Sequence, residues 1–262
     1  MVINNQFCKR NVQENLDVTV VKADKSTVSR QSEVTVEHFM EIYLNDRLVL
    51  RLVCTPENLA ELVAGRLVSG GYITEKQDVE SLYICENGQR AKVYLTKGIA
   101  LEESLKTEPT CCTANRQMLN PTGEQTQKIL AKADYKPEWI FRLAEEFAGG
   151  SRIHKKTKGT HSCYLMYNGE IVYSTEDIGR HNALDKAVGF ALINGYEREK
   201  CILFTSGRVP VDMAEKVIRA GIPILVSKAV PTDSAVELAG KYNLTLICKA
   251  WQDSYEIFYE AE

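Results

Sequence analysis

The strongest constraint on the fold is the regular alternation of apolar runs and amphipathic segments in the last third of the chain. The runs CILFTS, PILVSK and LTLICK have the pattern of buried strands, and VPVDMAEKVIRAG and SAVELAGKYN between them have helical spacing. Strands that alternate with helices need crossover connections, which place the strands in a mostly parallel sheet. This part of the chain is therefore predicted to be α/β.

The N-terminal half has a different pattern. The segments VTVEHFMEIYLNDRLVLRLVCT and VESLYICENGQRAKVYLT each predict a hairpin, and PENLAELVAGRLVSGGYI between them predicts a helix. Residues 1 to about 32 are polar and are predicted to be a loose arm or an edge strand. We therefore expect an N-terminal α+β domain over 1–125 that ends in a mobile loop (about 100–125), and an α/β domain over 126–262. A connector with so little patterning inside a compact protein is usually functional or disordered.

Composition excludes several classes of protein. A net charge of −3 gives no support for general nucleic-acid binding, which needs a basic excess. The N-terminus lacks the apolar core of a signal peptide, and no apolar run approaches the length of a membrane span. We expect a cytoplasmic protein with neither a nucleic acid nor a membrane as partner.

Polar residues follow two of the predicted parallel strands. Ser206, Gly207 and Arg208 follow the first, and Ser227 and Lys228 follow the second. Ligands of open α/β sheets bind beyond the carboxyl ends of strands, and a hydroxyl, a guanidinium and backbone N–H groups together suit a phosphate. Ordinary helix capping and a surface ion pair explain the same residues equally well.

The segment TEDIGRHNALDK is denser in polar chemistry than a connecting loop needs. Arg180 can clamp a phosphate or a carboxylate, and Glu176 or Asp177 can orient His181. The alternative is a capped helix with solvated charges. A second histidine, His161, begins a predicted strand, where a lone histidine is more often structural than a ligand.

The chain has eight cysteines, and most lie in apolar runs where they are expected to be small buried residues. Cys111 and Cys112 are the exception, because EPTCCTANRQMLNPTG is polar. A disulfide between neighbours has poor geometry, and the spacing of cysteines and histidines fits no zinc site, so no metal is expected. A reactive thiol fits better, with TANRQML as a short helix and Lys106 and Arg116 nearby favouring the thiolate.

Several of these segments together resemble one known family. The run STEDIGRHNALDKAVG, with TKGTHS before it and TSGRVPVDMAEKVIRAGIPILVSKAVPTDSAVELA after it, is similar to the FdhD/NarQ family of formate dehydrogenase accessory sulfurtransferases. RLVCTPENLAELVAGRLVSGGYI matches the N-terminal pattern of the same family, so the resemblance covers nearly the whole chain.

The resemblance implies a sulfur carrier that forms homodimers. Such a protein accepts persulfide sulfur from a cysteine desulfurase and sulfurates the molybdenum (or tungsten) bis(guanine dinucleotide) cofactor, which formate dehydrogenase requires. The implied fold of the C-terminal domain is a cytidine-deaminase-like three-layer α/β arrangement without zinc ligands.

The resemblance also assigns roles to residues. Many members carry Cys-x-x-Cys where this chain has CCTA, so Cys111 is the implied persulfide carrier, Ala114 replaces the second cysteine, and Cys112 is an auxiliary thiol. The implied residues that bind the cofactor nucleotide are His161, Arg180, His181, Ser206, Gly207, Arg208, Ser227, Lys228, Lys249, Ala250, Trp251, Gln252, Asp253 and Ser254. The KAWQDS segment that ends this set departs from the Gly- and Arg-bearing loop common in the family.

Two other functions remain open at this point. The missing second motif cysteine motivates a chaperone that binds the cofactor but transfers no sulfur. A nucleotide hydrolase on a deaminase-like scaffold is motivated by His161, Glu176 and His181.

Overall fold

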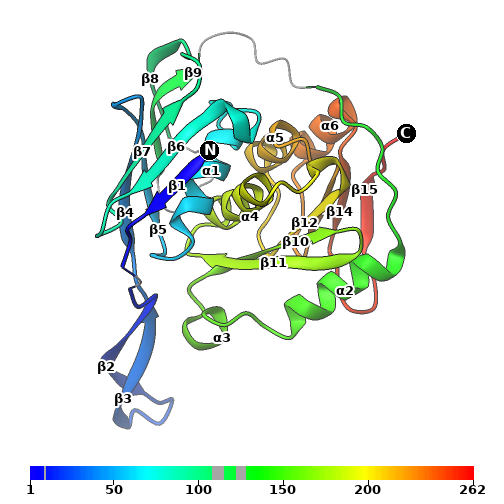
Figure 1. Cartoon of the computed structure of the whole chain (residues 1–262). Coiled ribbons are helices and arrows are strands. Elements are labelled where there is room, and N and C mark those ends of the chain that lie inside the picture. The colour runs from blue at the N-terminus through cyan, green and yellow to red at the C-terminus, as the bar shows by residue number, and fades with distance from the viewer. Residues whose placement is uncertain (9, 108–114, 122–127) are drawn as a thin grey trace.

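The structure is a computed structural model that describes residues 1–8, 10–107, 115–121 and 128–262 (Figure 1). Two sheets lie on either side of a layer of helices, and a further helix, α2 (Pro137–Ala148), covers the outer face of the second sheet (Figure 1). The predicted mixed α/β fold is confirmed. Within the described ranges no helix is both long enough and apolar enough to cross a membrane.

The first sheet is built from the N-terminal half in the order β1-β6-β7-β4-β5-β9-β8. Its strands are β1 (Val2–Asn5), β4 (His38–Leu44), β5 (Arg47–Cys54), β6 (Val79–Ile84), β7 (Arg90–Leu95), β8 (Leu101–Thr107) and β9 (Arg116–Pro121). Both predicted hairpins are present, as β4–β5 and β6–β7, and Asn45 and Asp46 at the β4–β5 turn both have positive φ. The helix between them, α1 (Leu59–Ser69), ends before Gly70 and Gly71 as predicted.

The first 35 residues divide into two parts. β1 is an edge strand of the first sheet and runs parallel to β6. β2 (Gln13–Val21) and β3 (Thr27–Thr35) instead pair with each other as a hairpin that extends away from the body (Figure 1). The predicted edge strand is therefore confirmed, but the rest of the arm is a regular two-stranded sheet.

The connector differs from its prediction. β8 and β9 form an antiparallel pair, and the backbone of β9 joins β5 where Gln117 lies opposite Leu50 and Arg116 opposite Arg51. The expected short helix over TANRQML is therefore wrong for its described residues from Arg116 onward. The free edge of β5 offers ladder hydrogen bonds to this segment, and such pairing overrides a weak local helix preference.

The second sheet has the order β11-β10-β12-β13-β14-β15. Its strands are β10 (His161–Tyr167), β11 (Glu170–Asp177), β12 (Cys201–Thr205), β13 (Ile224–Ser227), β14 (Thr245–Cys248) and β15 (Glu256–Tyr259). Only β12, β13 and β14 are mutually parallel. The prediction of a mostly parallel sheet is therefore too broad, because the β10–β11 hairpin and β15 add antiparallel strands at the two edges.

The helices of the second half are α2 (Pro137–Ala148), α3 (His154–Thr157), α4 (Arg180–Asn194), α5 (Val211–Arg219) and α6 (Asp233–Tyr242), with a short 3₁₀ turn η2 (Arg198–Lys200). Helices α5 and α6 lie at the segments predicted between the parallel strands, whereas α3 was not predicted. A second 3₁₀ turn, η1 (Lys76–Asp78), belongs to the first half. Helices α4, α5 and α6 cover the inner face of the second sheet and α2 covers the outer face (Figure 1). The specific likeness to cytidine deaminases stays a prediction.

Helices α1 and α4 cross at two glycines in the centre of the molecule. A Cβ atom on Gly65 would lie 1.7 Å from the carbonyl oxygen of Asp185, and one on Gly189 would lie 1.8 Å from that of Glu61. The backbones approach so closely that no side chain fits at either position. One apolar cluster runs from the first sheet through these helices to the second sheet. The boundary at residues 125 and 126 stays a prediction.

Candidate functional site

A buried ion pair marks the start of α4. Asp177, the last residue of β11, lies 2.6 Å from the ammonium of Lys186, and both side chains are fully buried. Thr55 of the first half donates its backbone N–H and its hydroxyl to the same carboxylate, each at 3.0 Å. The Lys186 ammonium also donates to the Thr55 hydroxyl at 2.7 Å. The polar motif therefore joins the two halves of the chain.

Two asparagines extend this network to the cysteine segment. Asn182 Nδ2 donates to Asp177 Oδ1 and to the carbonyl of Val53, both at 2.8 Å. Asn115 Nδ2 donates to Asn182 Oδ1 at 2.7 Å, and Asn115 Oδ1 accepts the Val53 N–H at 3.1 Å. Asn115 is buried and is the first described residue after 108–114. Asn115 is therefore fixed beside the start of α4.

Glu176 holds a neighbouring segment in place. Its carboxylate accepts the backbone N–H groups of Ile153 at 2.7 Å and His154 at 2.8 Å, and the Thr160 hydroxyl at 2.9 Å. Neither Glu176 nor Asp177 is the carboxylate beside His181, so that prediction is wrong. The imidazole of His181 is fully buried and its Nε2 lies 3.6 Å from Asp212 Oδ2.

A cavity of about 350 Å³ lies beside this network, at the ends of β12 and β13. It brings together three of the predicted residues, His161, Ser206 and Lys228. Ile178, next to the buried Asp177, also lines it. The remaining lining residues are Phe147, His154, Lys158, Gly159, Thr160 and Ser162.

The polar groups of the cavity lie at the ends of strands β10, β12 and β13. Ser206 Oγ accepts the backbone N–H of Ser162 at 3.0 Å and lies 3.4 Å from His161 Nδ1. The ammonium of Lys228 lies 5.2 Å from the ring centre of Phe147 and 4.9 Å from that of Trp251. A hydroxyl, an imidazole and an ammonium therefore share one cavity, and together they are suited to an oxyanion.

The charge state of His161 depends on its surroundings. Burial lowers the pKa of the imidazole, and the nearby Arg180 guanidinium lowers it further, while the Asp177 carboxylate acts in the opposite direction. His161 is therefore held neutral more strongly than a free histidine, and a bound anion would oppose that effect.

Three other predicted residues do not line the cavity but contact the residues around it: Ser227, Gly207 and Arg180. Ser227 is buried and donates its hydroxyl to the carbonyl of Gly207 at 2.7 Å while accepting the Ala229 N–H at 2.9 Å. A Cβ on Gly207 would lie 2.7 Å from Cδ of Arg180, so glycine lets the buried Arg180 pack there. Arg208 is exposed and does not line the cavity.

The KAWQDS segment adjoins the cavity through one residue. Lys249 pairs with Glu256 at 2.9 Å, and the buried Ala250 donates its N–H to the Ser227 carbonyl at 3.0 Å. Trp251 is 49% exposed and faces the Lys228 ammonium. Three further predicted residues are exposed: Gln252, Asp253 and Ser254. Cys111 and Cys112 lie outside the described residues.

Three cavity residues were not predicted from the sequence: His154, Lys158 and Phe147. The signal for His154 and Lys158 is the basic run IHKKTKGT just before His161, whereas Phe147 lies in the separate helix α2. Of the three residues behind the hydrolase alternative, only His161 lines this cavity, whereas Glu176 and His181 are engaged elsewhere. Within the described ranges no group of three or more His, Cys, Asp or Glu side chains is placed to hold a metal ion.

Known proteins are similar to this chain over most of its length. The FdhD/NarQ family profile matches residues 35–262. A curated relative from Halalkalibacterium halodurans, named sulfur carrier protein FdhD, is 37% identical over 229 residues, which cover 85% of this chain and 84% of the relative. A relative of the same name from Bacillus subtilis is 30% identical over 249 residues, covering 93% and 95%. A solved structure from Desulfotalea psychrophila, of a protein assigned as a formate dehydrogenase accessory protein, matches with a TM-score of 0.77 and 25% identity over 95% of this chain and 97% of that one.

Proposed function

The chain belongs to the FdhD/NarQ family, and on that premise we propose that it is a sulfur carrier protein that serves a formate dehydrogenase. Curated relatives that carry this name match it along most of both chains. The partners that follow are a sulfur donor and the catalytic subunit of the dehydrogenase, with a homodimer as the expected assembly.

The finer proposal concerns how the sulfur is carried. The thiolate of Cys111 attacks the outer sulfur of a persulfide on a cysteine desulfurase, a new S–S bond forms on Cys111, and the thiolate of the desulfurase leaves without net oxidation. The molybdenum or tungsten bis(guanine dinucleotide) cofactor then receives that sulfur as a substrate. Cys112 acts as an auxiliary thiol.

The observation that carries this proposal is the hydrogen bond between Asn115 and Asn182. Cys111 precedes Asn115 by four residues, so the covalent chain keeps their Cα atoms within about 14 Å. Asn182 also bonds to Asp177, which lies opposite His161 in the β10–β11 ladder. The chain is therefore tethered close to the cavity, and a thiol on such a tether can exchange sulfur with a ligand bound there.

We propose that the cavity binds the nucleotide part of the cofactor. The Lys228 ammonium and the Ser206 hydroxyl supply charge and a hydrogen bond for a phosphate, and Trp251 supplies a ring face next to them. The other residues that the resemblance implied act from further back: Arg180, Gly207 and Ser227 shape the cavity wall, and the KAWQDS turn forms its rim.

The decisive experiment treats the purified protein with a cysteine desulfurase and labelled cysteine, and locates the label by mass spectrometry. We expect the label on Cys111. Cys111→Ser should abolish loading and the maturation of formate dehydrogenase, because a hydroxyl holds no transferable sulfur, yet leave GDP binding intact. Cys112→Ser should be milder.

The same experiment separates the carrier from a cofactor chaperone. Normal GDP binding and dehydrogenase maturation by a protein whose Cys111 never becomes labelled would favour the chaperone. The reverse ranking, with Cys112→Ser inactive and Cys111→Ser active, would move the carrier role to Cys112.

A further inference from the structure

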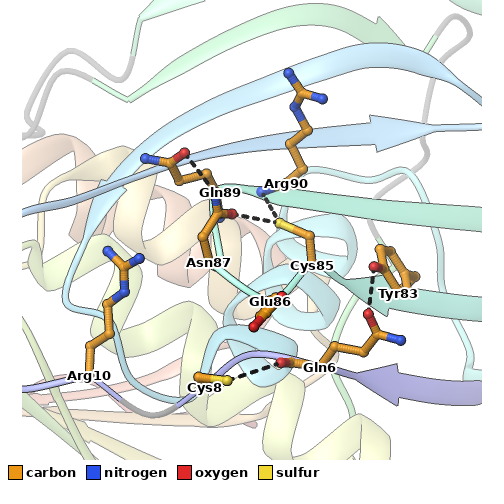
Figure 2. Close-up of a pocket in the computed structure, with 9 residues that line it drawn as sticks. All are labelled: Gln6, Cys8, Arg10, Tyr83, Cys85, Glu86, Asn87, Gln89 and Arg90. Atoms are coloured by element: carbon orange, nitrogen blue, oxygen red, sulfur yellow. Dashed lines mark hydrogen bonds between the residues drawn. The ribbon is translucent and has the colours of Figure 1, made fainter.

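A larger cavity, of about 710 Å³, lies at one end of the first sheet, where β6 ends and β7 begins (Figure 2). It contains two cysteines, Cys8 and Cys85, and both are free. Cys85 was expected to be a buried apolar residue, but it is half-buried and lines this cavity. The other lining residues are Gln6, Arg10, Tyr83, Glu86, Asn87, Gln89 and Arg90.

The Cys85 thiol is fixed as a hydrogen-bond donor. Its Sγ lies 2.9 Å from Asn87 Oδ1 and accepts the backbone N–H of Arg90 at 3.2 Å (Figure 2). The Asn87 oxygen must face this way, because it also accepts the Gln89 N–H at 3.1 Å while Nδ2 donates to Gln89 Oε1 at 3.0 Å. A thiolate at Cys85 would meet the lone pairs of that oxygen. Cys85 is therefore the less reactive thiol.

Cys8 has the opposite character. Its side chain is exposed, and among the described residues its Sγ makes only a long contact of 3.9 Å with the carbonyl of Gln6. Its backbone is nevertheless held, since Gln6 N–H donates to Ile84 O at 3.0 Å and Cys8 N–H donates to Glu86 O at 3.1 Å, which extends the β1–β6 ladder. An accessible thiol on a fixed backbone is suited to react with a ligand in the cavity.

The charges around these thiols are of both signs. Arg10 and Arg90 are two of the lining residues, and Glu86 adds a carboxylate. The amides of Gln6 and Gln89 add further hydrogen-bonding groups. A guanidinium binds a carboxylate well and a carboxylate binds an ammonium, so the cavity is suited to a small zwitterion. Within the described ranges these thiols belong to no group that would hold a metal ion.

We propose that this cavity binds an amino-acid persulfide and that Cys8 accepts its outer sulfur. The inference rests on the proposed function, to which it adds a second entry for sulfur that needs no desulfurase. The Cys8 thiolate attacks the outer sulfur of the donor, a new S–S bond forms on Cys8, the S–S bond of the donor breaks, and the donor leaves as a thiolate. One S–S bond replaces another, so no oxidant or reductant is needed.

The test incubates the full-length protein with cysteine persulfide and no desulfurase, alkylates the products, and measures added sulfur on each cysteine by peptide mass spectrometry. We expect sulfur on Cys8 within the first turnover, no loading of that peptide in Cys8→Ser, and normal loading in Cys85→Ser. Loading of Cys85 in place of Cys8 would overturn the proposal. Equal loading of Cys8 and of an added, unrelated peptide that carries an exposed cysteine would also overturn it.

Recognition of the donor is tested separately from reactivity of the thiol. The double variant Arg10→Gln, Arg90→Gln should slow loading of Cys8 by cysteine persulfide about tenfold, the usual effect of losing charge-assisted hydrogen bonds. The same variant should load at the wild-type rate with cysteamine persulfide, which has no carboxylate. The matched control is Lys22→Gln, Lys25→Gln at the β2–β3 turn, which removes the same charge far from the cavity. The binding site would be refuted if the control variant slowed the loading of Cys8 equally. It would also be refuted if the arginine variant slowed loading by both persulfide donors equally.

The outcome for Cys111 keeps the two proposals apart. Desulfurase-driven loading of Cys111 should be normal in Cys8→Ser. If Cys111 loads and Cys8 does not, the inference fails and the proposed function stands. If Cys8 loads and Cys111 never does, the proposed route through Cys111 fails.

Discussion

Two polar regions meet at the start of α4, and they differ in how their polar groups are used. In the buried network, the charges of Asp177 and Lys186 are paired and further satisfied by Thr55 and Asn182. In the adjacent cavity, Lys228 faces aromatic rings and Ser206 lies at the surface of an open space. The first region holds the two halves of the protein together, and the second can accept a ligand.

A dense polar segment is therefore not by itself a binding site. The motif TEDIGRHNALDK contributes mainly to the network, whose groups point at one another. The cavity instead draws on residues spread over β10, β12, β13 and the segment before β10. A charged group whose partners lie within the protein helps to hold the two halves of the fold together. A charged group that faces open space is available to bind a ligand.

The largest expected effect comes from breaking the network. Lys186→Met should lower the free energy of unfolding by about 3–5 kcal/mol, because it leaves the buried carboxylate of Asp177 without its counter-charge. Urea unfolding followed by circular dichroism measures this loss. The double variant Lys186→Met, Asp177→Asn should recover part of it, because no buried charge is left unpaired.

The control is the exposed pair of Lys92 and Asp46, whose atoms are 3.0 Å apart. Lys92→Met should leave stability unchanged, since solvent screens this pair. Equal losses from Lys186→Met and Lys92→Met would remove the distinction between the network and an ordinary surface pair.

The second prediction concerns binding in the cavity. Lys228→Met should weaken GDP binding by ~1.5–3 kcal/mol, the usual scale of a charge-assisted contact, with little change in stability. Arg208→Met removes the same charge from an exposed residue outside the cavity lining and should have a smaller effect. Isothermal titration calorimetry measures both. A larger effect at Arg208 would place the phosphate outside this cavity.

The third prediction uses the lowered pKa of His161. In the free protein the pKa of the imidazole is lowered, whereas a bound phosphate raises that pKa. The pKa of His161 is therefore higher in the GDP complex than in the free protein, and GDP affinity should rise as the pH falls between these two values. The rise is at most about tenfold for each pH unit that separates the two pKa values. His161→Gln should flatten this rise and leave only the titration of GDP itself. If wild type and His161→Gln show the same pH profile of GDP affinity, His161 does not interact with the phosphate.

The same lowered pKa predicts the effect on folding. Because the unfolded histidine binds a proton more readily than the folded one, stability contributed by neutral His161 is complete above the unfolded pKa. That contribution is lost as the pH falls from the unfolded pKa towards the folded one. The stability of the wild type relative to that of His161→Gln should therefore fall as the pH falls through this range, which thermal unfolding measures.

The smallest expected effect is at the rim. Trp251→Leu removes the ring that lies 4.9 Å from the Lys228 ammonium. An exposed cation–π contact is worth about 0.5–1 kcal/mol, so GDP binding and stability should each change by no more than that. A loss as large as that of Lys228→Met would mean that the ring contacts the nucleotide directly.

Local patterns predicted most of the fold. The three parallel strands, the helices between them and both N-terminal hairpins lie where the apolar spacing placed them. The strand β9 was missed because its pairing with the edge of β5 comes from a distant part of the chain. The antiparallel edge strand β15 was missed for the same reason, since its pairing with β14 is not encoded locally.

The site was only partly predictable. His161, Ser206 and Lys228 share a cavity because strand ends collect at one edge of a sheet, a rule that needs no structure. The partner of His181 was not predictable, because Asp212 belongs to a different helix and the nearer carboxylates in sequence bond elsewhere.

The glycine crossing of α1 and α4 has a consequence for biosynthesis. The apolar face of α1 emerges from the ribosome early, but α4, which covers it at Gly65 and Gly189, is synthesised only after most of the chain. At roughly 5–20 residues per second, the nascent N-terminal half waits many seconds for its covering helix. During that interval it exposes a surface that chaperones recognise, so the chain is expected to complete its folding late in translation, as one cooperative unit.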